Sequence, residues 1–115
     1  MRYDSQYDQY HYQRQQEIIE SWQIHDYTIQ LNKRLRTVLI ALNWHKNIFV
    51  NKHTELSNDS LKSIRNSFKK YLNEVKDIEI KLRLVNNYSK RVETIKNKIN
   101  ILILKTYDYE NKRNC

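Results

Sequence analysis

The sequence contains no glycine and no proline in 115 residues, and this absence constrains the fold more than any other feature. At an average usage of roughly 7% glycine and 5% proline, a chain of this length carries about a dozen such residues. Hairpin turns favour glycine, so barrels, sandwiches and hairpin-rich sheets are disfavoured. We therefore expect one small all-α domain. Its hydrophobic content of 39% is enough for an apolar stripe along its helices, but not for a thick globular core.

Apolar residues in the second half of the chain recur at steps of three and four, which places them on one face of a helix. The pattern changes phase near residue 85, where two consecutive steps of three follow each other and indicate local overwinding. We predict one long helix over residues 61–110. Its apolar seam consists of Leu61, Ile64, Phe68, Tyr71, Val75, Ile78, Leu82, Val85, Tyr88, Val92, Ile95, Ile99, Leu102 and Thr106.

The first half predicts a second long helix over residues 17–50, with the same spacing of apolar residues. Residues 1–16 form a Tyr- and Gln-rich segment that is equally consistent with helix and with disorder, and residues 111–115 form a C-terminal tail. Residues 51–60 are rich in turn-forming residues, and Ser57 or Asn58 can cap the helix that follows. The fold predicted is an elongated, coiled-coil-like antiparallel helical hairpin. The seam of its first helix consists of Ile24, Thr28, Leu31, Leu35, Val38, Leu42, His45 and Phe49.

The first helix has a second apolar face, roughly opposite its seam. A two-helix hairpin covers only one face of each helix, so this face requires further helices, either from a partner protein or from a second copy of the chain. The two tryptophans are the expected energetic anchors of such an interface. The predicted partner-binding residues are Ile18, Trp22, Ile29, Ile40, Trp44 and Ile48.

Positive charge is concentrated in the second half of the chain, which carries most of the net charge of +8. There, basic residues recur every seven positions and form a ladder along the predicted second helix. Such a ladder either keeps the helix surface soluble or contacts a polyanion such as DNA, RNA or an acidic protein surface. Its members are Lys62, Lys69, Lys76, Arg83, Lys90, Arg91, Lys98 and Lys105, and Lys112 continues the period.

Nothing in the sequence matches a catalytic motif, and we expect no enzyme activity. Phosphate-cradling loops need glycine, and the four histidines are not spaced as metal ligands, so we expect no catalytic residues, cofactor, metal or small-molecule substrate. The longest apolar run is Ile101 to Leu104, too short for a membrane span. A single cysteine, Cys115, cannot form an internal disulfide, and no secretory signal is evident at the N-terminus, so we expect an intracellular protein of the cytoplasm or nucleus.

These features together predict a non-catalytic helical interaction or scaffold subunit of a larger intracellular multiprotein assembly. It would dock through the second apolar face of the first helix, against another helical protein or a second copy of itself. The alternative is a basic helical protein that contacts the backbone of DNA or RNA through its lysine ladder.

Overall fold

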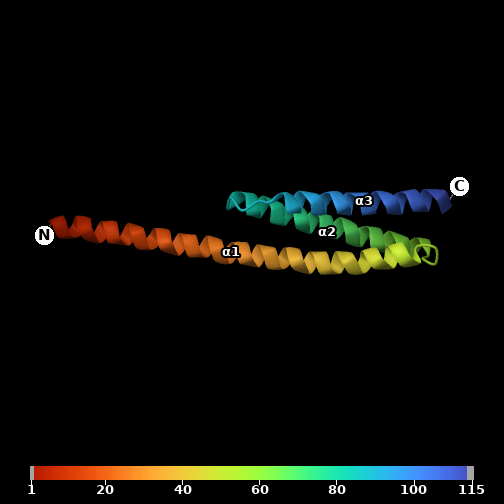
Figure 1. Cartoon of the computed structure of the whole chain (residues 1–115), viewed down its shortest axis with the longest axis horizontal. Coiled ribbons are helices and arrows are strands. Elements are labelled where there is room, and N and C mark those ends of the chain that lie inside the picture. The colour runs from red at the N-terminus through yellow and green to blue at the C-terminus, as the bar shows by residue number, and fades with distance from the viewer. Residues whose placement is uncertain (1, 114–115) are drawn as a thin grey trace.

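A computed structural model describes the backbone of residues 2–113 and the side chains of residues 23–113. It consists of three α-helices, α1 (Arg2–Lys52), α2 (Asn58–Leu84) and α3 (Lys90–Arg113), and the described residues contain no strand. The molecule is a rod with extents of 85 × 20 × 18 Å (Figure 1). The expected all-α, elongated fold class is therefore confirmed.

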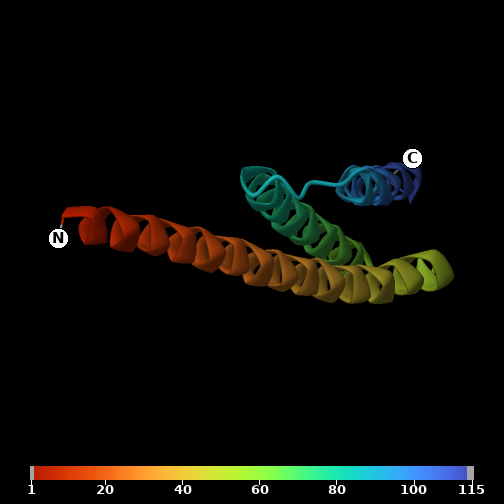
Figure 2. The same ribbon diagram turned by 60° about the vertical axis from the view of Figure 1, so that its left-hand side comes forward.

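The first helix is one continuous rod of 51 residues. At 1.5 Å per residue its length is about 75 Å, because neither proline nor glycine interrupts the hydrogen-bond ladder. Residues 2–16, which the sequence left open between helix and disorder, are part of this helix. The N-terminal part of α1 projects past the loop between α2 and α3, as two views of the ribbon show (Figures 1 and 2).

The turn between α1 and α2 is short and spans residues 53–57, within the predicted 51–60. Ser57 has extended backbone angles, and its Oγ accepts a hydrogen bond from the backbone N–H of Ser60 at 3.1 Å. Asp59 lies in the first turn of α2, where a negative charge stabilises the helix N-terminus. The predicted cap at Ser57 is confirmed.

The prediction of one continuous helix over residues 61–110 is wrong, because the chain reverses at residues 85–89. The reversal is a Schellman motif: the N–H of Asn86 donates to the carbonyl of Arg83 at 3.1 Å, and that of Asn87 to the carbonyl of Leu82 at 2.9 Å. Asn86 takes the left-handed conformation with φ of 57°. This position is usually glycine, and asparagine is the residue that replaces it most readily.

The reversal explains the phase shift in the apolar pattern. A continuous helix would place residues 88–106 against the N-terminal part of α1, which contains few aliphatic residues. Folding back instead buries the apolar face of α3 against α2, so the predicted hairpin of two equal helices is replaced by three helices. Residues 111–113 of the predicted tail belong to α3.

The core follows α2, which packs against both neighbours, whereas α1 and α3 share no comparable interface (Figure 2). Every buried apolar residue except Leu72 belongs to a predicted seam, so most seam positions are confirmed. Ile24, at the beginning of the first seam, is exposed because α2 ends before reaching it. The buried apolar residues are Leu31, Leu35, Val38, Leu42, Phe49, Leu61, Ile64, Phe68, Leu72, Val75, Ile78, Leu82, Val92, Ile95, Ile99 and Leu102.

Candidate partner-binding surfaces

The face of α1 opposite the core exposes large apolar side chains. Ile40 is 65% exposed and Trp44 is 63% exposed, and because they are four residues apart they lie one turn above the other. Ile29 is 40% exposed on the same side, three turns earlier. The Trp44 ring makes an edge contact with His45, with ring centroids 4.8 Å apart, and otherwise faces solvent. These three residues form the exposed α1 face.

Three further residues belong to the predicted face. Ile48 is partly buried and packs against the core near the α1–α2 turn. The side chains of Ile18 and Trp22 lie outside the described residues. The structure therefore places Ile29, Ile40 and Trp44 on one exposed side of α1, and Ile48 lies partly buried against the core.

A groove runs between α1 and α3 and has a volume of about 440 Å³. Its lining comes from these two helices only, because α1 and α3 both pack on α2 and leave a gap between themselves. Leu39 and Leu42 of α1 and Ile95, Ile101 and Leu102 of α3 supply its apolar surface. Nothing in the sequence pattern indicated this groove, since it exists only when α3 folds back.

Four cations and no carboxylate line the α1–α3 groove: Lys46 from α1 and Arg91, Lys98 and Lys105 from α3. None of the four forms a salt bridge or a side-chain hydrogen bond with any described residue. The three α3 residues recur every seven positions and so share one side of the helix. The groove therefore combines an apolar surface with an uncompensated positive rim.

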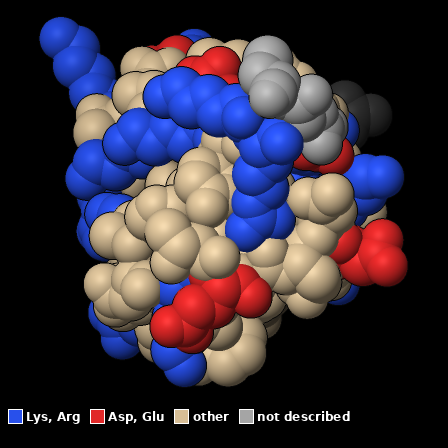
Figure 3. Space-filling model, turned by 90° about the vertical axis from the view of Figure 1, so that its right-hand side faces the viewer, with Lys and Arg blue, Asp and Glu red and all other residues tan. Residues whose placement is uncertain are grey.

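The basic ladder predicted on one long helix is divided between two antiparallel helices. All its members are exposed. Arg91, Lys98 and Lys105 line the α1–α3 groove. Lys69 of α2 instead donates a hydrogen bond to the Tyr107 hydroxyl on α3 at 2.7 Å. This bond holds the pKa of the Tyr107 hydroxyl below its ordinary value. Lysine and arginine cover more of the end of the rod than acidic residues do (Figure 3). Lys62, Lys76, Arg83 and Lys90 are the remaining exposed members.

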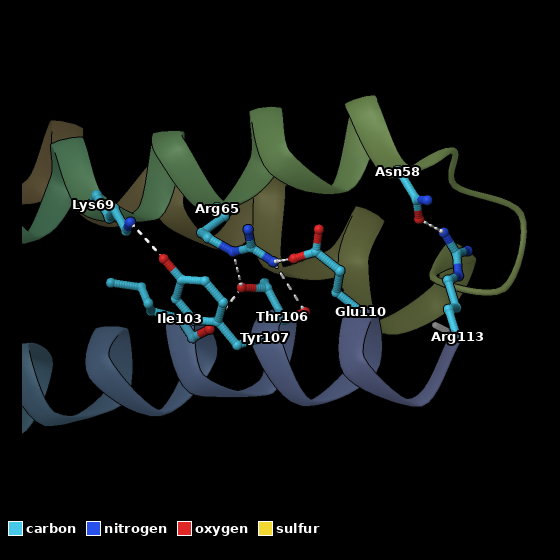
Figure 4. A network of polar contacts seen from close by, with 8 residues as sticks. All are labelled: Asn58, Arg65, Lys69, Ile103, Thr106, Tyr107, Glu110 and Arg113. Carbon is cyan, nitrogen blue, oxygen red and sulfur yellow. Dashed lines mark hydrogen bonds and ion pairs between the residues drawn. The ribbon is translucent and has the colours of Figure 1, made fainter. Parts of the chain in front are cut away.

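A buried polar network joins α2 to α3, and sequence reasoning missed its central residue (Figure 4). Arg65 is only 6% exposed, and its Nε donates to the Thr106 hydroxyl at 3.0 Å. Its Nη2 pairs with the Glu110 carboxylate and donates to the Thr106 carbonyl at 3.3 Å. The guanidinium also lies 3.8 Å from the centroid of the Tyr107 ring. The available signal was Thr106, a polar residue at a predicted seam position.

The interface between α1 and α2 uses an exposed ion-pair cluster. Arg34 Nη2 lies 2.8 Å from the Glu74 carboxylate and 3.1 Å from that of Asp77, and Lys81 also pairs with Asp77 at 3.0 Å. The hydrogen bond from Lys81, followed by that from Arg34, lowers the pKa of the Asp77 carboxyl. The hydrogen bond to Glu74 raises the pKa of Arg34. The cluster bridges α1 and α2 at the surface and lies apart from the α1–α3 groove.

His45, a residue of the predicted first seam, forms a hydrogen bond across the α1–α2 interface. Its Nδ1 lies 2.9 Å from the Tyr71 hydroxyl across the α1–α2 interface. Burial at this interface raises the pKa of Tyr71.

Among the described residues, no group of three or more His, Cys, Asp or Glu side chains is arranged to hold a metal ion.

Across the helices as far as they are described, no stretch is both long enough and apolar enough to cross a membrane. Comparison of the chain with protein families, with curated proteins and with solved structures finds no match.

Proposed function

We propose that the protein is a helical interaction or scaffold subunit that docks onto a helical partner within a larger intracellular assembly. The observation that carries this proposal is the exposed α1 face, where Ile40 and Trp44 are each more than 60% exposed on a rigid helix. Tryptophan is the residue most enriched among interface hot spots, and each aromatic side chain buries about 150–250 Å² when covered. A single cysteine in the chain supports the reducing location of the assembly.

The face has the form that helix docking requires. Ile29, Ile40 and Trp44 lie on one side of a continuous helix, so a partner helix can contact them in sequence without reshaping the bundle. Their backbone is ordered by the packing of the opposite face of α1 against α2, so little conformational entropy is lost on docking. We therefore place the partner-binding role on these residues, together with Ile18 and Trp22 further along the same helix.

The experiment compares complex formation by the full-length chain and by the double substitution Ile40→Ala with Trp44→Ala. The tagged chain is recovered from extracts of its native source, and co-purified proteins are quantified by mass spectrometry. Loss of both anchors is expected to weaken binding of the specific partner by about 30-fold or more, because even one hot-spot residue contributes about 2 kcal/mol or more. Circular dichroism should remain helical, since both side chains face solvent.

The matched control is Asn47→Ala, an exposed substitution on the same helix that removes no apolar surface. It should bind as the unchanged chain does. Partner recovery that is equal for the double variant and for the control would remove the docking role from this face.

The alternative function is nucleic-acid binding, and one observation favours it. Every member of the basic ladder is exposed, and four cations in the α1–α3 groove lack a carboxylate partner in the described part of the chain. Binding to DNA or RNA should weaken steeply with salt, and each ladder lysine replaced should reduce the slope of log K against log salt by about 1. Docking through Ile40 and Trp44 should respond weakly to salt, so a salt titration separates the two functions.

A further inference from the structure

The N-terminal part of α1 and the rest of the chain carry opposite charge. Residues 2–27 contain five acidic and two basic side chains, a net charge of −3, whereas residues 28–115 contain nineteen basic and eight acidic ones, a net charge of +11. This boundary between negative and positive charge coincides with the end of the three-helix bundle. There the side-chain amide of Asn87, in the α2–α3 loop, donates a hydrogen bond to the Thr28 hydroxyl at 3.0 Å. We call residues 2–27 of α1 the N-terminal arm.

The arm has no neighbouring helix in its own copy. It projects past the loop between α2 and α3 (Figures 1 and 2), and its described residues 23–27 are all exposed. Since α1 is a single helix through Thr28, the arm continues straight and points away from the groove of its own chain. An acidic helix without a neighbour and a basic groove without an occupant are thus present in one molecule.

We propose that two copies of the chain form an antiparallel dimer in which the N-terminal arm of each copy occupies the α1–α3 groove of the other. The groove would then hold a fourth helix beside α1, α2 and α3. Both copies contribute the same surfaces, so the contact is closed by a two-fold axis. The dimer consists of two four-helix bundles joined end to end by the two continuous α1 helices.

The lengths of the two elements agree. The arm has 26 residues and is about 39 Å long, and α3 has 24 residues and is about 36 Å long. A two-fold axis beside residues 27 and 28 places the arm of one copy along the second half of α1 in the other. Asp8 of one copy is then level with Asn47 of the other, next to Lys46, and Glu17 is level with Val38, next to Leu39.

The sequence of the arm also supplies apolar surface for the groove. Tyr3, Tyr7 and Tyr10 are spaced by four and three residues, so they fall on one face of the helix. In the groove they would cover Leu42 and the half-exposed Ile101. Acidic residues flank them, as a groove with a positive rim requires.

Charge complementarity favours a second copy over an unrelated occupant. Lys46, Arg91, Lys98 and Lys105 have no carboxylate beside them in the groove, and the arm provides carboxylates on a preformed helix at equal concentration. This dimer does not depend on the proposed docking through Ile40 and Trp44, which face away from the groove. The substitution Trp44→Ala should leave the dimer intact, and loss of the dimer should leave Trp44 exposed for docking, so the two proposals fail separately.

The test begins with the mass of the full-length chain in light scattering at low salt. The unchanged chain should have twice its monomer mass of 14.2 kDa, and the dimer should weaken as salt rises. The groove variant, Lys98→Glu with Lys105→Glu, should raise the dimer dissociation constant by about 100-fold or more, because like charges then face each other. The arm variant, Asp8→Lys with Glu17→Lys, should have the same effect.

Mixing the two variants provides a positive result that a folding defect cannot produce. The reversed arm of one variant complements the reversed groove of the other, and the unchanged arm meets the unchanged groove. The mixture should therefore form a one-to-one heterodimer with nearly the original affinity. The control variant, Lys62→Glu with Lys76→Glu, carries the same charge change on exposed α2 positions outside the groove and should dimerise as the unchanged chain does.

A distance measurement fixes the orientation. Spin labels are placed at Gln9→Cys in one sample and at Asn47→Cys in the other, both with Cys115→Ser, and the samples are mixed. Within one chain these positions are about 57 Å apart along α1, whereas in the proposed dimer the two copies bring them within about 20 Å. A monomer at all concentrations, a dimer indifferent to the groove variant, or a mixture that stays dissociated would each overturn the proposal.

Discussion

The two interfaces of α2 are both crossed by an arginine that pairs with carboxylates, but the two pairs lie in different surroundings. On the α3 side, the side chains of Arg65 and Glu110 are 7% and 16% exposed, and Thr106 completes the network. On the α1 side, the side chains of Arg34, Glu74 and Asp77 are 39%, 44% and 46% exposed. The same chemical pair is therefore enclosed at one interface and solvated at the other.

The difference shows which interface depends on its polar contact. A solvated ion pair contributes little because water and salt screen it, so the α1–α2 interface rests on its apolar seam. Removal of one partner of a buried pair leaves an uncompensated charge in a low-dielectric environment, which is far more costly. The buried network also fixes the register of α3 on α2, since Arg65 must reach both Thr106 and Glu110 from one position.

The largest expected effect is that of Arg65→Ala. It leaves the Glu110 carboxylate and the Thr106 hydroxyl without their donor in a buried site and should lower the free energy of unfolding by about 3–5 kcal/mol. Arg34→Ala, at the solvated interface, should lower it by about 1 kcal/mol or less. Urea unfolding followed by circular dichroism, at one protein concentration, measures both values.

Arg36→Ala serves as the matched control, because Arg36 is exposed and forms no ion pair with a described residue. It should leave stability unchanged within about 0.5 kcal/mol. Arg65→Lys retains the charge but loses the fork of donors that reaches Thr106 and Glu110 together, so it should recover only part of the loss. Equal effects of Arg65→Ala and Arg34→Ala would contradict the contrast between the two interfaces.

The next effect in size concerns the turn that creates the α2–α3 interface. Asn86 has φ of 57°, a conformation that is unfavourable for residues with a β-carbon other than asparagine and aspartate. Asn86→Ala should destabilise the protein by about 1 kcal/mol, and Asn86→Gly should match or exceed the stability of the unchanged chain. Thermal unfolding measured by circular dichroism distinguishes the two.

Asn97→Ala is the control for this pair, because Asn97 is exposed within α3, where alanine is the better helix former. It should not destabilise the protein. If Asn86→Ala also had no effect, the left-handed turn would not be the element that positions α3.

The positions of the core could be predicted from the sequence, but the path of the chain could not. Spacing by three and four places Leu61, Phe68 and Val75 on one face whatever that face meets, so these residues are buried as expected. The break after Leu84 depends on Asn86 adopting a conformation that is usually left to glycine, in a chain without glycine. The phase shift marked the correct place, but it is compatible with an overwound helix as well as with a reversal.

The surfaces show the same contrast between features that the sequence could predict and features that it could not. Ile40 and Trp44 were found from a helical wheel because their exposure depends on one helix alone. The α1–α3 groove requires two helices that are far apart in sequence, so no local pattern reveals it. Arg65 was missed for a related reason: its neighbours Thr106 and Glu110 become close only when α3 folds back onto α2.

The smallest expected effect tests the solvated interface through pH. The pKa of Asp77 lies below its ordinary value of 3.8 in the folded protein, because Lys81 and Arg34 stabilise the ionised carboxylate. The ionised carboxylate therefore contributes its full stabilisation above pH 3.8. This contribution is lost as the pH falls through the lower pKa that the carboxyl has in the folded protein. Near neutral pH, the Asp77→Asn variant should be slightly less stable than the unchanged chain. This loss of stability should be smaller than the loss caused by Asn86→Ala.

This difference should shrink and vanish well below pH 3.8, where the carboxyl of the unchanged chain is protonated as well. Added salt should reduce the difference at neutral pH, because the pair is solvated. The difference between Arg65→Ala and the unchanged chain should persist in salt, since water has little access to that site. A salt-resistant effect of Asp77→Asn would show that the exposed cluster behaves like the buried network and would remove the distinction between the two interfaces of α2.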